Sequence, residues 1–236
     1  MNKVFKHLSL AAAISAAMVS TQAVAYEAGD WVVRAGVTTV DPQESGDQLT
    51  LNGSEAAFIG AVGPEELGVD SDTQLGLTVE YMLTNNWGIE LLAATPFQHT
   101  ASATETLAGL DVADIKHLPP TLMAVYHFNS GKKFQPYLGA GINYTIFFSE
   151  DTTSEADATF ATLGLTGGDV ELDDSWGLSV QAGFDYHLND KWLVNASVRW
   201  IDIDTEAEIK FDNGAKIKAD VDIDPYVYTV SVGYKF

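Results

Sequence analysis

Eight stretches of alternating polar and apolar residues run through the sequence, and the separators between them differ sharply in length. The stretches cover residues 31–41, 72–83, 87–101, 117–128, 134–149, 175–188, 192–211 and 215–236. The short separators are 84–86, 129–133 and 189–191, and the long ones, rich in Gly, Ser, Thr and acidic residues, are 42–71, 102–116 and 150–174. An even number of strands, with short turns at one end and long loops at the other, is typical of a β-barrel of the outer-membrane type.

The two faces of these stretches indicate which side meets lipid. Between residues 176 and 188 the even-numbered side chains are all apolar, whereas the odd-numbered ones are Gly, Ser, Gln, Asp and His. Successive residues of a strand point to opposite faces. Aromatic residues gather near the ends of the stretches, as in the interfacial girdles of membrane barrels. The pattern therefore predicts an all-β fold, an eight-stranded antiparallel transmembrane up-and-down β-barrel whose apolar face points outward.

The first 25 residues have the pattern of a secretory signal peptide. Lys3 and Lys6 supply positive charge, residues 8–19 form a short apolar core, and residues 23–25, Ala-Val-Ala, resemble a cleavage site. The apolar core is too short to span a bilayer. We therefore expect residues 1–25 to be removed on export and residues 26–236 to form a single barrel domain in the outer membrane.

Composition excludes several classes of function. The 33 acidic residues outnumber the 12 basic ones, and a protein that binds nucleic acid needs Lys and Arg to neutralise phosphates. The sequence has no cysteine, so no disulfide can stabilise the fold. It also has no Gly-x-Ser-x-Gly, His-Glu-x-x-His or phosphate-loop motif. We therefore expect no enzyme, cofactor or metal; His99 and His117 could meet at the rim, but two histidines alone are weak evidence for a metal site.

Several stretches together are similar to one family of membrane proteins. They are WGIELLAATPF (87–97), HLPPTLMAVYHF (117–128), PYLGAGINYT (136–145), DSWGLSVQAGFDY (174–186) and the terminal GYKF. These segments resemble the OmpW family of small outer-membrane proteins. The resemblance implies an eight-stranded barrel with a narrow, partly apolar lumen, linked to the passage of small hydrophobic molecules and to stress responses. Phe236 resembles the C-terminal signal that the outer-membrane assembly machinery recognises.

Alternation directs several charged side chains into the barrel, among them Arg34, Glu80, Glu90 and Arg199. The interior of an eight-stranded barrel is only just wide enough for side chains. One interpretation is a plug in which Arg–Glu pairs satisfy buried charges. The other is functional: Leu92 also faces inward, where the resemblance implies an apolar constriction, and Arg199 would modulate it. A pairing of Arg199 with Glu80 or Glu90 would favour the plug.

The last two stretches are longer than the roughly 9–11 residues that a membrane crossing needs, and their polarity inverts in the overhang. There the carboxylates face outward, as at a rim that stands in water. The apolar side chains that face inward are Ile201, Ile203, Ile217, Val221 and Ile223. They predict an apolar vestibule in which a hydrophobic solute could enter; packing against folded-back loops is the alternative.

Residues 212–214, Asp-Asn-Gly, join these two stretches. To keep both faces consistent, they must form a three-residue loop with Gly214 in the left-handed conformation. This register places Asp204 opposite Asp222, and directly opposed like charges are destabilising. Divalent cations shared with lipopolysaccharide could relieve the repulsion, because they prefer oxygen ligands; plain screening by solvent is the alternative.

Pro96, Pro119 and Pro120 interrupt two neighbouring stretches near the outer rim. Proline cannot donate a hydrogen bond to a strand ladder. A locally unpaired wall at this point could let a solute leave sideways into the outer leaflet. Otherwise the prolines only mark the end of the membrane ladder.

The function that these features favour is binding of small hydrophobic compounds and assistance of their passage across the outer membrane, through a narrow, partly apolar lumen with lateral exit. The alternative is a non-conducting structural or surface-interaction protein, with a plugged lumen and its function in acidic extracellular loops. The expected partners are outer-membrane lipid and lipopolysaccharide, small hydrophobic solutes and the outer-membrane assembly machinery. No nucleic acid is expected.

Overall fold

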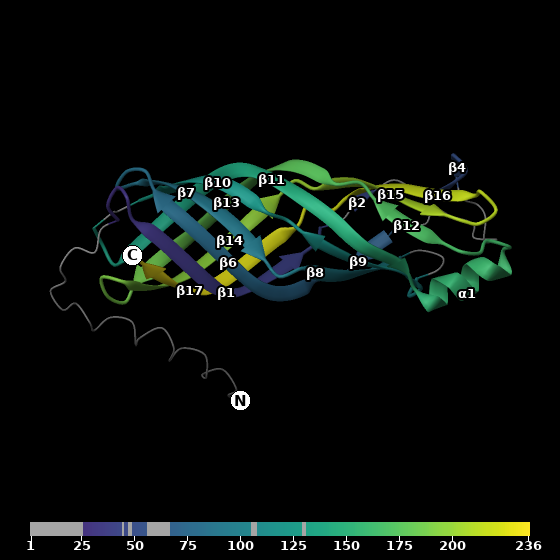
Figure 1. Cartoon of the computed structure of the whole chain (residues 1–236), viewed down its shortest axis with the longest axis horizontal. Coiled ribbons are helices and arrows are strands. Elements are labelled where there is room, and N and C mark those ends of the chain that lie inside the picture. The colour runs from purple at the N-terminus through teal and green to yellow at the C-terminus, as the bar shows by residue number, and fades with distance from the viewer. Residues whose placement is uncertain (1–25, 44, 47–48, 56–66, 105–107, 129–130) are drawn as a thin grey trace, which may run out of the picture.

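Eight antiparallel strands close into a barrel, as predicted. The computed structural model describes residues 26–43, 45–46, 49–55, 67–104, 108–128 and 131–236, so the expected signal peptide, residues 1–25, lies outside the described residues. In their order around the wall the barrel strands are β10 (Thr121–His127), β7 (Trp87–Ala94), β6 (Asp72–Met82), β1 (Trp31–Asp41), β17 (Tyr226–Lys235), β14 (Trp192–Ile201), β13 (Ser175–His187) and β11 (Phe134–Thr152). β10 also pairs with β11, which closes the circle (Figure 1).

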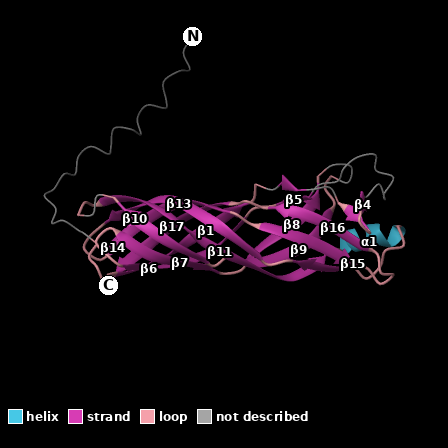
Figure 2. Ribbon diagram, turned by 90° about the horizontal axis from the view of Figure 1, so that it is seen from above, coloured by secondary structure: helices cyan, strands magenta, loops and turns pink. Residues whose placement is uncertain are grey.

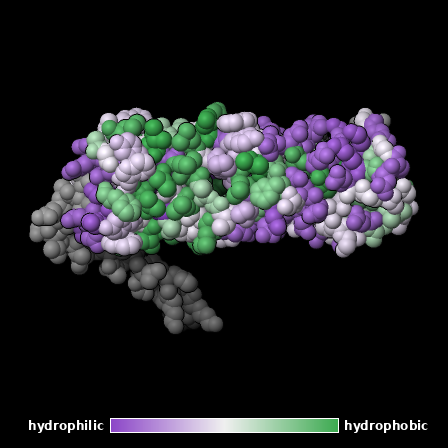
Figure 3. All heavy atoms as spheres, in the orientation of Figure 1, coloured by the Kyte–Doolittle hydropathy of each residue, from purple (hydrophilic) through white to green (hydrophobic). Residues whose placement is uncertain are grey.

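The outside of the barrel is apolar. Large hydrophobic side chains on the outward face stay exposed, for example Leu178 and Val230, each 63% exposed. Trp31, Trp87 and Trp192 are about half exposed at the end with the tight turns. Figure 3 shows hydrophobic residues gathered over the barrel and hydrophilic residues over the opposite half of the molecule. A soluble protein rarely exposes so large an apolar belt, which fits contact with lipid instead.

The C-terminal strand closes the barrel against the first strand. β17 pairs with β1 along its whole length, and the N–H of Phe236 donates to the carbonyl of Trp31 at 2.9 Å. The Phe236 ring is 70% exposed and packs edge-on against Tyr234. The strict alternation at the end of the chain therefore belongs to the barrel wall. The role of Phe236 as an assembly signal stays a prediction.

Four of the eight stretches form two strands each. The pairs are β7 with β8 (Phe97–Ala103), β9 (Asp111–Leu118) with β10, β14 with β15 (Asp204–Lys210), and β16 (Lys216–Asp222) with β17. Inward positions stay on odd-numbered residues across three of these breaks, so the sequence periodicity does not reveal them. At Pro96 the inward positions change from even to odd, because the chain leaves the ladder there.

Beyond the barrel the wall continues as two sheets (Figure 2). One contains β5 (Leu67–Val69), β8, β9 and the upper part of β11; the other contains β12 (Asp169–Leu172), β15, β16, β3 (Thr50–Leu51) and β4 (Ser54–Glu55), with β2 (Ser45–Gly46) beside β16. The outward side chains of β8 and β9, such as Gln98, Asp114 and Lys116, are polar, so this extension stands in water. Segments expected as long loops thus contribute short strands.

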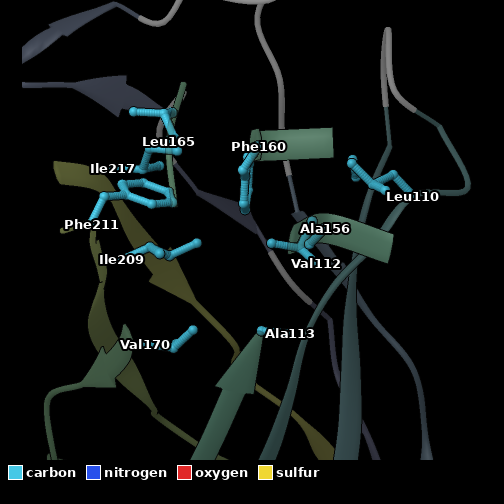
Figure 4. Close-up of a cluster of buried hydrophobic side chains, with 11 residues drawn as sticks. Leu110, Val112, Ala113, Ala156, Phe160, Leu165, Val170, Ile209, Phe211 and Ile217 are labelled. Atoms are coloured by element: carbon cyan, nitrogen blue, oxygen red, sulfur yellow. The ribbon is translucent and has the colours of Figure 1, made fainter. Parts of the chain in front are cut away.

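A short helix covers the tip of the extension. α1 (Ser154–Thr162) begins after Thr153, whose hydroxyl accepts a hydrogen bond from the N–H of Ala156 and caps the helix. Ala156 and Phe160 pack into a hydrophobic cluster that also contains Ile217 (Figure 4). We refer to it as the tip cluster. Within the described ranges, no helix is long and apolar enough to cross a membrane.

Candidate functional site

Buried charges fill the part of the barrel near the tight turns. The guanidinium of Arg34 lies 2.6 Å from the carboxylate of Asp185, 2.8 Å from that of Glu80 and 3.3 Å from that of Glu90. His127 Nε2 lies 2.7 Å from the second oxygen of Glu80. None of these side chains is more than 3% exposed. Alternation on β1, β6, β7, β10 and β13 points them all inward, where neighbouring side chains must satisfy the buried charges.

Arg199 extends this network toward the extension. Its Nη2 lies 3.0 Å from Glu90 Oε1 and 2.6 Å from Gln181 Oε1, and its Nε lies 3.2 Å from the sulfur of Met123. The ionic plug is the set Arg34, Glu80, Glu90, Asp185 and Arg199. The pairing of Arg199 with Glu90 is the arrangement that favours a closed lumen at this depth.

Tyr26 completes the plug, although the sequence did not point to it. Its side chain is fully buried, and its hydroxyl donates to Asp185 Oδ2 at 2.6 Å. The ring packs edge-on against His127 and His187. Tyr26 precedes the first alternating stretch, so periodicity could not place it. The one available signal was an aromatic residue directly after the cleavage pattern.

Above the ionic plug the interior becomes apolar. The residues of the predicted vestibule are all at most 9% exposed. Four of them, Ile201, Ile203, Val221 and Ile223, form one cluster with Val40, Phe97, Phe147, Ala219 and Val227, which we call the vestibule cluster. Ile217 lies instead in the tip cluster, where it packs with residues of helix α1. The alternative interpretation, packing against folded-back segments, therefore applies to this residue. Leu92, 2% exposed, faces inward on β7 between the plug and the vestibule cluster.

A cavity of about 50 Å³ lies between the two sheets of the extension. Val221 and Ile223 form part of its wall, with Val69 and Leu172 from the neighbouring strands. The rings of two histidines, His99 and His117, also line it. Its surface is otherwise formed almost wholly by apolar side chains, which suits an apolar ligand.

The barrel wall is interrupted beside the vestibule cluster. The ladder between β7 and β10 ends below Pro96, Pro119 and Pro120, and pairing resumes above them between β8 and β9. The N–H of Tyr144 donates to the carbonyl of Pro120 at 3.1 Å. This bond attaches the chain just before β10 to the neighbouring strand β11. On the other side Ala94, the last residue of β7, packs against the vestibule cluster. We call this interruption the proline seam.

An acidic cluster lies on the outside of the extension. Asp202, Asp204 and Asp224 bring carboxylate oxygens within 4.8 Å of one another. The predicted turn is confirmed, with Gly214 at φ +83° and Asp204 opposite Asp222. Partial burial and the neighbouring carboxylates raise the pKa of Asp204 and of Asp224 above the ordinary range. Bridging of these groups to lipopolysaccharide by divalent cations stays a prediction.

Replacing Asp222 with asparagine is expected to stabilise the folded protein by up to about 1 kcal/mol at pH 7, because it removes a directly opposed like charge. The raised pKa of Asp204 means that the folded state binds a proton at a pH at which the unfolded chain has lost it. Acidification therefore relieves the same repulsion, and the gain should shrink toward pH 4. Unfolding midpoints at both pH values, with Asp190→Asn in a tight turn as the control, measure the effect. A gain that grows on acidification would contradict this account.

Known proteins share this architecture. The model of the OmpW family matches residues 27–236. Outer membrane protein W of Vibrio cholerae serotype O1 is 44% identical over 227 residues, which cover 95% of this chain and 96% of that protein. Outer membrane protein W of Escherichia coli K12 is 44% identical over 234 residues, covering 98% of this chain and all of that protein. The crystal structure of the outer membrane protein OprG from Pseudomonas aeruginosa is 44% identical with a TM-score of 0.80, covering 91% of this chain and 99% of that one.

A more distant relative is the dibenzothiophene metabolism operon protein PahQ of Pseudomonas aeruginosa, 24% identical over 213 residues, which cover 89% of this chain and 90% of that protein. The matches to outer membrane protein W extend over nearly the whole chain, so they include the barrel, the proline seam and the extension. The eight-stranded barrel, its apolar belt and these matches all indicate the same kind of protein. The chain is an outer-membrane β-barrel and belongs to the OmpW family.

Proposed function

We propose that the protein binds small hydrophobic compounds in the apolar cavity and assists their passage across the outer membrane. The observation that carries this proposal is the cavity itself, which lies between two sheets that stand in water. A compound that enters it exchanges water for apolar side chains, a gain of about 0.8 kcal/mol for each methylene group buried.

The route from the cavity leads sideways rather than straight down. A solute that followed the barrel axis would have to part the ionic plug, whose ion pairs are buried and short. Separating buried charges is far more costly than displacing apolar side chains. The proline seam lies at the level of the vestibule cluster and lacks backbone pairing between its two sides, so it supports lateral exit into the outer leaflet. In this proposal Leu92 forms the floor of the route, and Arg199 below it keeps the lumen closed.

The name of one relative supports the same class of solute. PahQ is named for an operon of dibenzothiophene metabolism. Dibenzothiophene is an aromatic compound with no hydrogen-bond donor. A barrel that admits such a compound needs an apolar compartment, and this chain has one.

Uptake of labelled toluene by intact cells tests the proposal. A strain that lacks the protein would be restored with the native protein, with Ile223→Asp or with Ile223→Leu. Ile223 lines the cavity, so a carboxylate there should reduce uptake to the level of the deletion strain, whereas leucine keeps the wall apolar and should restore it. Barrel assembly of each variant must be equal, which the amount of folded protein in outer-membrane fractions measures.

A structural or surface-interaction role is the second candidate, and the ionic plug favours it. A lumen closed by Arg34 and Arg199 would conduct nothing along its axis, and the outward face of β15 and β16 is rich in carboxylates. Equal uptake of toluene in the deletion strain and in all restored strains would reject passage of this solute. The acidic extension would then be the place to search for a partner.

A further inference from the structure

His117 lies at the centre of an aromatic row, and it lines the cavity together with Phe147. The strand register places it opposite Phe97 on one side and opposite Phe147 on the other. Its ring is nearly parallel to that of Phe147, with centroids 5.8 Å apart, and lies 5.6 Å from that of Phe97. The His117 side chain is only 4% exposed. A polar ring therefore lies buried between two apolar rings.

A hydrogen-bonded relay connects His117 to the backbone. His99 Nε2 lies 3.1 Å from His117 Nε2, and His99 Nδ1 lies 2.6 Å from the carbonyl oxygen of Asp70. A carbonyl oxygen only accepts, so Nδ1 of His99 carries a proton. In the tautomer in which Nδ1 holds the one ring proton of His99, Nε2 accepts, and the proton between the two rings belongs to Nε2 of His117.

In this relay Nδ1 of His117 is a hydrogen-bond acceptor without a donor in the described part of the chain. Burial lowers the pKa of His117 to about 3, with a further contribution from His99, so its ring is neutral and holds one proton. That proton lies on Nε2, and Nδ1 has no hydrogen-bond partner among the described residues. A buried acceptor without a donor is unfavourable, and a ligand that supplies a donor would relieve it.

We propose that Nδ1 of His117 is the polar anchor of the cavity, and that the cavity takes small apolar compounds that carry one hydroxyl donor, such as phenol. The proposal rests on the proposed function, because it assumes that the cavity binds hydrophobic compounds at all. The surface that faces the cavity is apolar, so the ligand must turn the His117 ring slightly to reach Nδ1. The apolar body of the ligand then occupies the space beside Val221 and Ile223.

Phenol and toluene are the matched probes, because they differ by a hydroxyl in place of a methyl group. Their dissociation constants would be measured by ligand-observed NMR with the full protein in lipid nanodiscs, with empty nanodiscs to subtract partition into lipid. In His117→Phe, which keeps the aromatic row, binding of phenol is expected to weaken roughly three- to tenfold, as for loss of one hydrogen bond. Binding of toluene should change less than about twofold, since the apolar wall is retained.

His187→Phe is the matched control. His187 is also fully buried and lacks partners for both ring nitrogens among the described residues, but it lies near the tight turns, away from the cavity. Its replacement should leave both probes unaffected. The nitrogen-15 signals of the histidines in the native protein provide a readout that needs no variant: phenol should move the Nδ1 signal of His117 toward that of a hydrogen-bonded acceptor, and toluene should not.

The outcomes separate the two proposals. If toluene and phenol both bind but neither the nitrogen-15 signal nor His117→Phe distinguishes them, the anchor is rejected and the apolar cavity stands. If neither probe binds the native protein beyond its partition into lipid, both proposals fall. If His117→Phe does not assemble, the nitrogen-15 shift in the native protein decides alone.

Discussion

Replacing Arg34 with methionine is expected to destabilise the folded barrel by about 3–5 kcal/mol, the range for removing one partner of a buried ion pair. The guanidinium contacts Glu80, Glu90 and Asp185, and its side chain is 2% exposed. Methionine fills much of the same space but leaves these carboxylates with fewer donors in a site that water does not reach. Urea unfolding in lipid bilayers measures the loss as a shift of the midpoint at constant slope.

Two further variants show whether charge is the cause. In Arg34→Met combined with Asp185→Asn, one of the unpaired carboxylates is gone, so part of the lost stability should return. Lys132→Met, at an exposed lysine beside a tight turn, should change stability by less than about 0.5 kcal/mol. A loss below about 1 kcal/mol in Arg34→Met would show that water reaches the carboxylates. The lumen would then be less closed than the short ion pairs indicate.

The membrane part of the fold could be predicted from the sequence because one rule governs it. Every barrel strand has lipid on one side and the lumen on the other, so each carries the same alternation of side chains. The extension follows no such rule. β2, β3, β4 and β5 have two or three residues each, too few for periodicity. β3 pairs with its neighbour β4, but β2 and β3 also pair with β16, and β5 pairs with β8, which are more distant in the sequence.

The sequence predicted which side chains of the site point inward, but not which residues they contact. The alternation of side chains along the strand is enough to direct Arg34 inward. Its shortest contact, however, is with Asp185, which lies 151 positions away in the sequence and on the opposite half of the barrel. The same alternation directs both Ile217 and Val221 inward. Helix α1 and its neighbours cover the first, whereas the second lines the cavity. Tertiary packing decides between these two environments, and one sequence does not contain that information in readable form.

Gly141→Ala is expected to have the second large effect, a loss of about 2–3 kcal/mol and a lower yield of assembled barrels. A Cβ at Gly141 would lie 2.0 Å from the carbonyl oxygen of Leu122 and 2.7 Å from Cα of Met123. Both atoms belong to the backbone of β10, which cannot retreat without breaking the ladder to β11. Unfolding midpoints in lipid and the folded fraction in outer-membrane preparations measure the two effects.

Gly139→Ala, two residues earlier on the same face of β11, is the matched control. Its Cβ would meet the side chain of Gln181 at 2.9 Å and the nearest backbone atom only at 3.3 Å, so a side chain can yield and the loss should be about 1 kcal/mol or less. Equal losses in both variants would mean that β10 moves freely against β11. That outcome would also weaken the proposed route, because lateral exit through the proline seam needs β10 to be fixed on β11 while only the β7 side opens.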